Sequence, residues 1–303
     1  MSKVVYYLSP SSFCFGVKRS IDQLNTIIIQ HPGEKIFCIH ALVHNPKVTK
    51  EFEAKGVSFV EDIDAVEDTH AIIILSAHGT NRKMIDEAQA KYKAVYNLEC
   101  PFVTKIYTEV DNLLKKWISK IVYIGKENHQ EGKNVIAYIR YRGGEVSICE
   151  KQEDIKNILY TTEEEIWVLA QTTLNFAYVQ EMIASIKSTY PHAQMPALSD
   201  VCRATYERQT VVLQHLNAFD TFIVIGGKES NNTKELYTIW VQNGKQSFYG
   251  ESLEDILQYP EAELFAHERV AITGGASTPI EDIKAVVAYY TSHGYEAKIL
   301  ELS

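Results

Sequence analysis

The chain has 303 residues, of which 46% are hydrophobic and 23% charged, as in an ordinary soluble globular enzyme. Its formal net charge of -9 argues against a nucleic-acid partner, because contact with phosphate backbones requires a basic face. No apolar run is close to the length of about 20 residues that a membrane-spanning helix needs. The N-terminus lacks the pattern of a secretory signal. We therefore expect a cytoplasmic protein without a membrane partner.

The first third of the sequence predicts a strand, a cysteine, a helix and two further strands. β-branched and aromatic residues at 4–8 predict the first strand, and Cys14 follows it. Apolar residues at helical spacing from Val17 to Ile28 predict a helix. Strands are then expected at 36–39 and 72–75, and each runs into a polar loop, at 41–45 and 76–80.

The same order of elements recurs twice. Cys100 and Pro101 open a second helix, where proline suits the first turn, and strands at 121–124 and 167–170 run into polar loops at 125–132 and 171–175. Cys202 precedes a third helix with a weaker apolar stripe. Strands at 222–225 and 270–272 then run into polar loops at 226–232 and 273–279.

The alternation of strands and helices predicts an α/β fold built from small, mostly parallel sheets. Because parallel sheets place their ligand loops at the carboxyl ends of the strands, each repeat presents a cysteine and two polar loops at one edge. We expect three similar lobes around a pseudo-threefold axis with a central cluster. The expected boundaries are 1–98, 99–199 and 200–281, with a C-terminal segment 282–303 that packs back on the first lobe.

The five cysteines fall into two groups. Cys38 and Cys149 lie inside strand-like runs and are interpreted as core residues. Cys14, Cys100 and Cys202 each lie where a strand gives way to a helix. Three such thiolates favour a 4Fe–4S cluster with one open iron over structural zinc, whose ligands usually come in close pairs along the chain. For an isolated cysteine, a role as a small buried hydrophobe remains the alternative.

The polar loops supply the remaining groups of a candidate site for a phosphorylated substrate. Their side chains can donate hydrogen bonds to phosphate oxygens, and the flanking glycines allow backbone N–H groups to approach. Glu131 is interpreted as a proton donor with His129 as its partner, and Thr172 as a group that orients a hydroxyl. Taken alone, each of these residues is more often a surface or capping residue than a functional one. The candidate phosphate ligands are His44, His78, Ser230, Asn232 and Ser277.

Several segments together resemble the 4-hydroxy-3-methylbut-2-enyl diphosphate reductase (LytB/IspH) family. The match runs in the family's order from residue 13 to about residue 279. The segments that carry it are Phe13-Cys14-Phe15-Gly16-Val17-Lys18-Arg19, Val43-His44-Asn45, Ser76-Ala77-His78-Gly79, Cys100-Pro101-Phe102-Val103-Thr104-Lys105, Gln171-Thr172-Thr173-Leu174 and Gly274-Gly275-Ala276-Ser277.

The resemblance implies a two-electron reductive dehydroxylation of an allylic diphosphate, giving isopentenyl and dimethylallyl diphosphate, the last step of the non-mevalonate isoprenoid pathway. It implies a trilobal α/β fold with a 4Fe–4S cluster on Cys14, Cys100 and Cys202. The side chains implied to face the substrate hydroxyl are His129, Glu131 and Thr172. An external electron-donor protein, ferredoxin-like or flavodoxin-like, is expected because no nicotinamide or flavin fingerprint is present. The implied diphosphate ligands are His44, His78, Ser230, Asn231, Asn232 and Ser277.

The sequence departs from the family pattern at a few positions beside these residues. Ser12 replaces a glycine, Leu98-Glu99 replaces Ala-Thr before Cys100, and Gln130 replaces a proline. Asn231 replaces a serine. The alternatives are a divergent paralogue with another substrate, a non-catalytic redox or diphosphate-binding relative, and a three-cysteine lyase similar to quinolinate synthase, which would need carboxylate-binding arginines in its loops. A purely structural α/β protein would be colourless after anaerobic purification.

Overall fold

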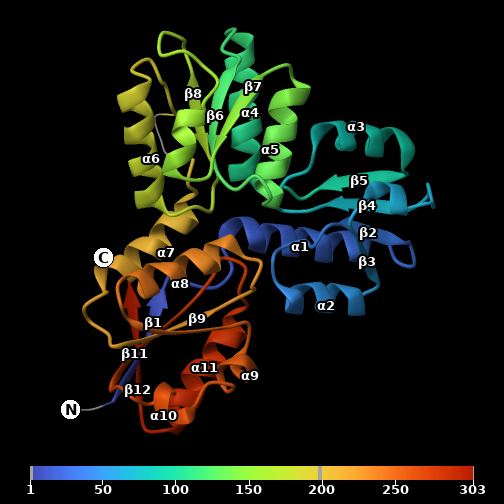
Figure 1. Cartoon of the computed structure of the whole chain (residues 1–303). Helices are drawn as coiled ribbons and strands as arrows, with labels where there is room; N and C mark the ends of the chain where they lie inside the picture. The colour runs from blue at the N-terminus through green and yellow to red at the C-terminus, as the bar shows by residue number, and fades with distance from the viewer. Residues whose placement is uncertain (1–2, 197–199, 303) are drawn as a thin grey trace. The chain divides into compact units, whose positions relative to one another are not determined.

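The structure is a computed structural model that describes residues 3–196 and 200–302 (Figure 1). The chain forms two compact units. The first unit contains the N-terminal residues through Lys18, His44–Lys47 and the chain from Arg203 onward. The second unit contains Arg19–Val43 and Val48–Cys202. Among the described residues, no helix is both long and apolar enough to span a membrane.

The first unit is built on one five-stranded parallel sheet. Its strand order is β10 (Gln246–Gly250), β9 (Thr221–Ile225), β11 (Arg269–Gly274), β1 (Val4–Ser9) and β12 (Glu296–Glu301). Alternate residues of β9 face opposite sides, so Phe222 and Val224 enter one core while Ile223 and Ile225 enter the other. The helices are α7 (Arg203–Gln214), α8 (Asn231–Gln242), α9 (Leu253–Ile256), α10 (Glu261–Leu264) and α11 (Ile280–Ser292).

Strand β1 does not belong with the rest of the lobe expected at residues 1–98. Strand β1 pairs with β11 on one side and β12 on the other, so it belongs to the sheet of the C-terminal part of the chain. Its backbone thereby has partners on both edges, and Val5 and Leu8 are fully buried on opposite faces. Strand β12, in the C-terminal segment, pairs with the edge of β1 opposite β11. The expected boundary at residue 199 lies outside the described residues.

The second unit contains two further parallel sheets. One has the order β3 (Val57–Val60), β2 (Ile36–Ile39), β4 (Ile72–Leu75), β5 (Ala94–Asn97), and the other β7 (Glu145–Cys149), β6 (Lys120–Ile124), β8 (Trp167–Ala170). Two 3₁₀ turns lie at Ile63–Ala65 and Gln152–Asn157. Its helices, the first two of which start in the first unit, are α1 (Phe15–Gln30), α2 (Pro46–Ala54), α3 (Arg82–Lys91), α4 (Pro101–Lys115), α5 (Gln130–Tyr141) and α6 (Phe176–Thr189).

The three-stranded sheet shows how the apolar pattern determines the layers. Ile121 and Tyr123 of β6 pack against α4 and α5, whereas Val122 and Ile124 pack against α6. Helices α4 and α5 lie on the opposite side of this sheet from α6 (Figure 1). Because helices cover both faces of the sheet, the sequence of β6 is a continuous apolar run, as is usual for a parallel strand.

The predicted α/β fold class is confirmed, with three small parallel sheets. All seven predicted strands are present, and a helix follows each of the three junction cysteines. Cys38 and Cys149 lie in β2 and β7 with no exposed surface, as expected for core residues. Burial raises the pKa of both thiols, that of Cys149 to about 12, so neither is a ready thiolate ligand.

Candidate functional site

A buried carboxyl group lies at the carboxyl edge of the three-stranded sheet in the second unit. Glu131 is in the first turn of α5, which follows β6, and Thr172 follows β8. Since β6 and β8 pair in parallel, the segments after them meet. The Thr172 N–H donates to Glu131 Oε1 at 2.7 Å, and the Thr172 hydroxyl donates to Oε2 at 2.8 Å. Both carboxylate oxygens are therefore held by one residue.

The environment of Glu131 favours its protonated form. Only 3% of the residue is exposed, and this burial raises the pKa of Glu131 to about 7. The two hydrogen bonds from Thr172 lower the pKa and the charge of Asp200 raises it, but loss of hydration is the largest effect. A carboxyl group that titrates near neutrality can both hold and release a proton under physiological conditions.

His129 caps the same helix. Its Nδ1 accepts a hydrogen bond from the Glu131 N–H at 3.2 Å, so the neutral ring carries its proton on Nε2 and can donate there. At Gly132, the first turn of α5 lies close to the loop that precedes this helix, since a Cβ atom on Gly132 would lie 2.2 Å from Lys126 O. Only glycine permits this approach, which places the first turn of α5 with His129 and Glu131 at the sheet edge.

Cys100 and His78 lie on adjoining segments of the second unit. They follow the paired strands β5 and β4, and the Cys100 N–H donates to Ala77 O at 3.0 Å. Cys100 is the N-cap of α4, and Pro101 occupies the first helical position as predicted. The loop that carries His78 is also tied to α5, because the Asn134 side chain donates to Gly79 O at 2.7 Å.

Cys202 adjoins the Glu131–Thr172 pair. Its N–H donates to Thr172 O at 2.9 Å, so the backbone of Cys202 runs alongside the residue that holds Glu131. Two residues earlier, Asp200 Oδ2 accepts a hydrogen bond from the Ala170 N–H at 2.9 Å at the end of β8. Burial raises the pKa of Asp200 to about 6. The second unit thus brings Glu131, Thr172 and Cys202 into one hydrogen-bonded chain.

The first unit brings together Cys14 and three predicted phosphate ligands around Ala276 and Ser277. Cys14 N–H donates to Ala276 O at 2.9 Å, while Ala276 N–H donates to Asn232 Oδ1 at 2.8 Å. Next to it, the Ser277 hydroxyl donates to His44 O at 3.1 Å. Gly227 approaches the same carbonyl so closely that a Cβ atom would lie 2.3 Å from His44 O. Backbone and side-chain contacts therefore fix the relative places of these four segments.

Three helices begin in the first unit, just beyond neighbouring strands of its sheet. Helices α1, α8 and α11 follow β1, β9 and β11, whose carboxyl ends share one edge. Ser230 caps α8 by accepting the Thr233 N–H at 3.4 Å, and Asn231 and Asn232 occupy its buried first turn. Helix N-termini at a sheet edge favour anions, because their N–H groups and positive dipole ends face the same region.

The chemistry of the three junction cysteines fits thiolate ligation. Cys14, Cys100 and Cys202 form no disulfide among the described residues and are partly exposed, in contrast to the two buried strand cysteines. The Val17 N–H points to Cys14 Sγ at 3.5 Å, an arrangement at a helix start that stabilises a thiolate. Within the described part of either unit, no three His, Cys, Asp or Glu side chains form a site for a single metal ion. A donor set made of thiols alone suits an iron–sulfur cluster.

The chain is similar to known proteins over almost its full length. Residues 5–291 match the family described as LytB protein. The chain belongs to the LytB family. A 4-hydroxy-3-methylbut-2-enyl diphosphate reductase of Wolbachia pipientis subsp. Culex pipiens (strain wPip) is 30% identical over 92% of this chain and 89% of the relative. The reductase of Haemophilus ducreyi is 33% identical over 94% of this chain and 89% of the relative.

Two solved structures are also similar. The E-1-hydroxy-2-methyl-but-2-enyl-4-diphosphate reductase of Plasmodium falciparum superposes with a TM-score of 0.91 at 26% identity, over 99% of this chain and 92% of that one. A second, titled as (E)-4-hydroxy-3-methyl-but-2-enyl diphosphate reductase, the terminal enzyme of the non-mevalonate pathway, has a TM-score of 0.65 at 27% identity. The match covers 94% of this LytB chain and 99% of that one.

The predicted site residues are divided between the two units. The first unit holds Cys14, His44, Ser230, Asn231, Asn232 and Ser277, and the second holds Cys100, Cys202, His78, His129, Glu131 and Thr172. Sequence reasoning missed Asn134 and Asp200. Asn134 lies one turn beyond Glu131 on α5, a spacing that places it near the same helix face and could have identified it. Asp200 had no comparable signal, because its hydrogen bond with the Ala170 N–H joins segments 30 residues apart in the sequence.

Proposed function

We propose that this chain is a 4-hydroxy-3-methylbut-2-enyl diphosphate reductase. The observation that carries the proposal is the buried Glu131–Thr172 pair, with its proton available near neutral pH, in a member of the LytB family. The reaction breaks the allylic C–O bond, consumes two electrons and two protons, releases water, and leaves isopentenyl or dimethylallyl diphosphate with a new C–H bond.

We infer that Cys14, Cys100 and Cys202 hold a 4Fe–4S cluster with one open iron. The LytB family depends on iron and sulfur, and these three are the partly exposed cysteines of the chain. When bound, the cluster supplies electrons and a Lewis-acidic iron for the substrate oxygen. The electrons come from an external ferredoxin-like or flavodoxin-like protein in this proposal.

The diphosphate group is assigned to His44, His78, Ser230, Asn231, Asn232 and Ser277. In the first unit these side chains accompany the N-terminus of α8 and the close backbone approach at Gly227. Neutral or positive donors and a helix N-terminus are the groups that bind phosphate oxygens well. The role of this set is to anchor the charged end of the substrate.

The hydroxyl end of the substrate is assigned to Glu131, Thr172 and His129. Protonated Glu131 delivers a proton to the departing oxygen, which then leaves as water. Thr172 fixes the orientation of the carboxyl group through its N–H and hydroxyl. His129 offers its Nε2–H as a further donor, because its Nδ1 is engaged by the Glu131 N–H.

The test begins with anaerobic purification, an absorption spectrum and an iron count. About four irons per chain after reconstitution are expected for the cluster. The protein is then given the allylic diphosphate and a reduced donor, and the products are identified by mass spectrometry. Glu131→Gln should lower turnover by about a hundredfold or more with the iron count unchanged. Glu127→Gln is the control, since Glu127 is an exposed carboxylate in the loop that precedes α5.

Each alternative has its own result in this experiment. A colourless, iron-free preparation contradicts the cluster and leaves a structural α/β protein. A full cluster without consumption of the diphosphate contradicts the enzymatic proposal and supports a redox or diphosphate-binding relative. Turnover that is unaffected by Glu131→Gln contradicts the assignment of the proton donor.

A further inference from the structure

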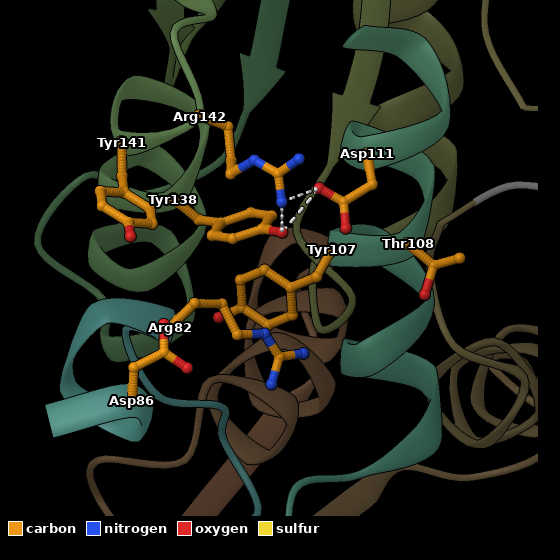
Figure 2. A pocket seen from close by; sticks show the side chains of 8 residues that line it. All are labelled: Arg82, Asp86, Tyr107, Thr108, Asp111, Tyr138, Tyr141 and Arg142. Carbon is orange, nitrogen blue, oxygen red and sulfur yellow. Dashed lines mark hydrogen bonds and ion pairs between the residues drawn. The ribbon is translucent and has the colours of Figure 1, made fainter. Parts of the chain in front are cut away.

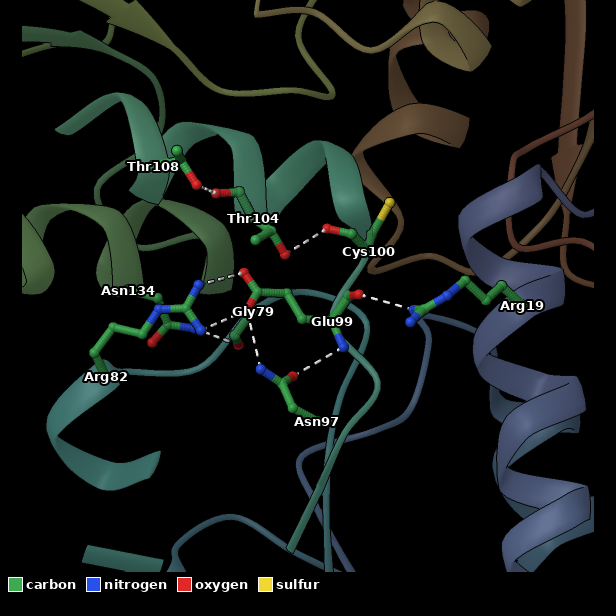
Figure 3. A network of polar contacts seen from close by, with 9 residues as sticks. All are labelled: Arg19, Gly79, Arg82, Asn97, Glu99, Cys100, Thr104, Thr108 and Asn134. Atoms are coloured by element: carbon green, nitrogen blue, oxygen red, sulfur yellow. Dashed lines mark hydrogen bonds and ion pairs between the residues drawn. The ribbon is translucent and has the colours of Figure 1, made fainter. Parts of the chain in front are cut away.

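Glu99, which replaces the usual threonine before Cys100, forms a buried ion pair (Figure 3). Its side chain is 2% exposed, and Arg82 Nη1 lies 2.9 Å from Glu99 Oε2. Arg82 Nη2 donates to Oε1 at 3.4 Å. Figure 3 shows the Glu99 carboxylate pointing toward Arg82, while the sulfur of Cys100 points to the opposite side of the chain. The charge of Glu99 is therefore balanced locally and directed away from the thiol.

The backbone around Glu99 is fully hydrogen-bonded. Each of the six N–H and C=O groups of residues 98–100 has a partner, at distances from 2.8 to 3.1 Å. Two of the donors are side chains of α1, which reach across to the turn. In chain order the partners are Leu75 O, Ser20 Oγ, Asn97 Oδ1, Arg19 Nη1, Ala77 O and the N–H groups of Val103 and Thr104. These hydrogen bonds connect the turn to β4, to the His78 loop and to α1.

Arg82 connects this turn to a second part of the candidate site. It is the first residue of α3, directly after the loop that carries His78. Its guanidinium lies 4.3 Å from the centre of the Tyr107 ring, so the charged group contacts both this ring and Glu99 (Figure 2). The Arg82–Glu99 pair thus spans from the His78 loop to the residue beside Cys100.

We propose that the Arg82–Glu99 pair positions Cys100 as a cluster ligand by locking the 97–100 turn to the His78 loop. The inference rests on the proposed function, which supplies the cluster. Glu99 and Arg82 act here as positioning residues, through the turn and not through contact with substrate. Removing Arg82 leaves the carboxylate of Glu99, which is 2% exposed, without compensation, so the turn must rearrange to hydrate it. The side chain of Arg82 is 23% exposed and can be hydrated in place.

The first test measures how firmly the cluster is held. Iron release to a chelator is followed in anaerobically purified protein. Arg82→Met should accelerate it about tenfold or more, the usual effect of losing a residue that supports a metal ligand. Glu99→Gln should change it little, because the amide oxygen still accepts from Arg82. Arg142→Met is the control. Arg142 pairs with Asp111 at 2.9 Å and lines the same pocket as Arg82 (Figure 2). Asp111 lies about three turns along α4 from Cys100.

The second test requires no cluster. The iron-free, full-length chain is alkylated, and the rates at Cys100 and Cys202 are resolved by peptide mass spectrometry. Arg82→Met should raise the rate at Cys100 about tenfold while Cys202 in the same molecule stays within about twofold, since the pair lies beside Cys100 alone. Equal acceleration at both cysteines indicates general loosening and overturns the proposal.

The two tests separate this inference from the proposed function. If the parent protein binds no iron, the proposed function fails, but selective exposure of Cys100 in Arg82→Met still supports the positioning role. If the parent binds iron and Arg82→Met behaves like Arg142→Met in both tests, the positioning role is wrong and the proposed function stands. Glu99→Gln behaving like Arg82→Met would also contradict it, because the amide preserves the geometry on which it depends.

Discussion

Replacing Glu131 with glutamine should remove a specific pH dependence of stability. Glutamine has the shape of a protonated carboxyl group: its oxygen can accept the Thr172 N–H, and its amide can donate to the Thr172 hydroxyl. The variant therefore keeps both contacts that hold Glu131 in the parent. It differs only in that it cannot ionise, so the comparison isolates the titration of one buried group.

The magnitude follows from the pKa of Glu131, which burial raises from 4.5 to about 7. The native state then holds a proton between these values that the unfolded chain has lost, so the parent loses stability as pH rises through this window. The total loss is about 3 kcal/mol, at 1.36 kcal/mol per pKa unit. Above about pH 7 the loss is complete, and below about pH 4.5 it is absent.

The assay is urea unfolding of the reduced, iron-free parent and variant, followed by circular dichroism from about pH 5 to about pH 8. The free energy of unfolding of Glu131→Gln should rise steadily relative to that of the parent across this range. The difference should approach about 3 kcal/mol at the upper end. The free energy of unfolding of Glu127→Gln, a change at an exposed position, should vary with pH as that of the parent does. Parallel curves for the Glu131 variant would refute the reasoning, because they require an ordinary carboxyl pKa at this position.

Three further outcomes are expected. Thr172→Val removes the hydroxyl donor that lowers the pKa of Glu131, so the fall of kcat/KM at high pH should shift to higher pH in a rate profile. Ser12→Gly should raise the free energy of unfolding by about 1 kcal/mol in urea, because Ser12 has a φ of 74°, where glycine is favoured. Cys149→Ala should leave the iron count of the purified protein unchanged, since this thiol is buried in β7.

Most strands could be predicted from the sequence, and so could the division of the cysteines into strand and junction residues, because both depend on local patterns. Parallel strands that are covered on both faces are continuous apolar runs, and β6 and β9 are recognisable for that reason. The partner of β1 could not be predicted in this way. Its apolar run fits several sheets equally well, and the choice of β11 and β12 depends on the packing of residues more than 260 positions away.

The candidate site shows the same division at finer scale. His129 and Glu131 were recognisable from their spacing in one loop, and Thr172 from the polar loop after β8. Their hydrogen bonds were not, because 41 residues separate Thr172 from Glu131. The raised pKa of Glu131 also depends on burial, which only the packed sheet edge provides.

Glu99 shows why a departure from a family pattern must be judged together with its partner. From the sequence, a carboxylate beside Cys100 is an added negative charge next to a metal ligand. In the structure the charge is paired with Arg82, 17 residues earlier, and the side chain is turned away from the sulfur. A lone buried carboxylate would be costly, whereas a paired one is tolerated and restricts the turn to one arrangement. The effect of the glutamate at position 99 therefore depends on the arginine at position 82. An experiment that restores the threonine of the family at position 99 should replace Arg82 in the same variant.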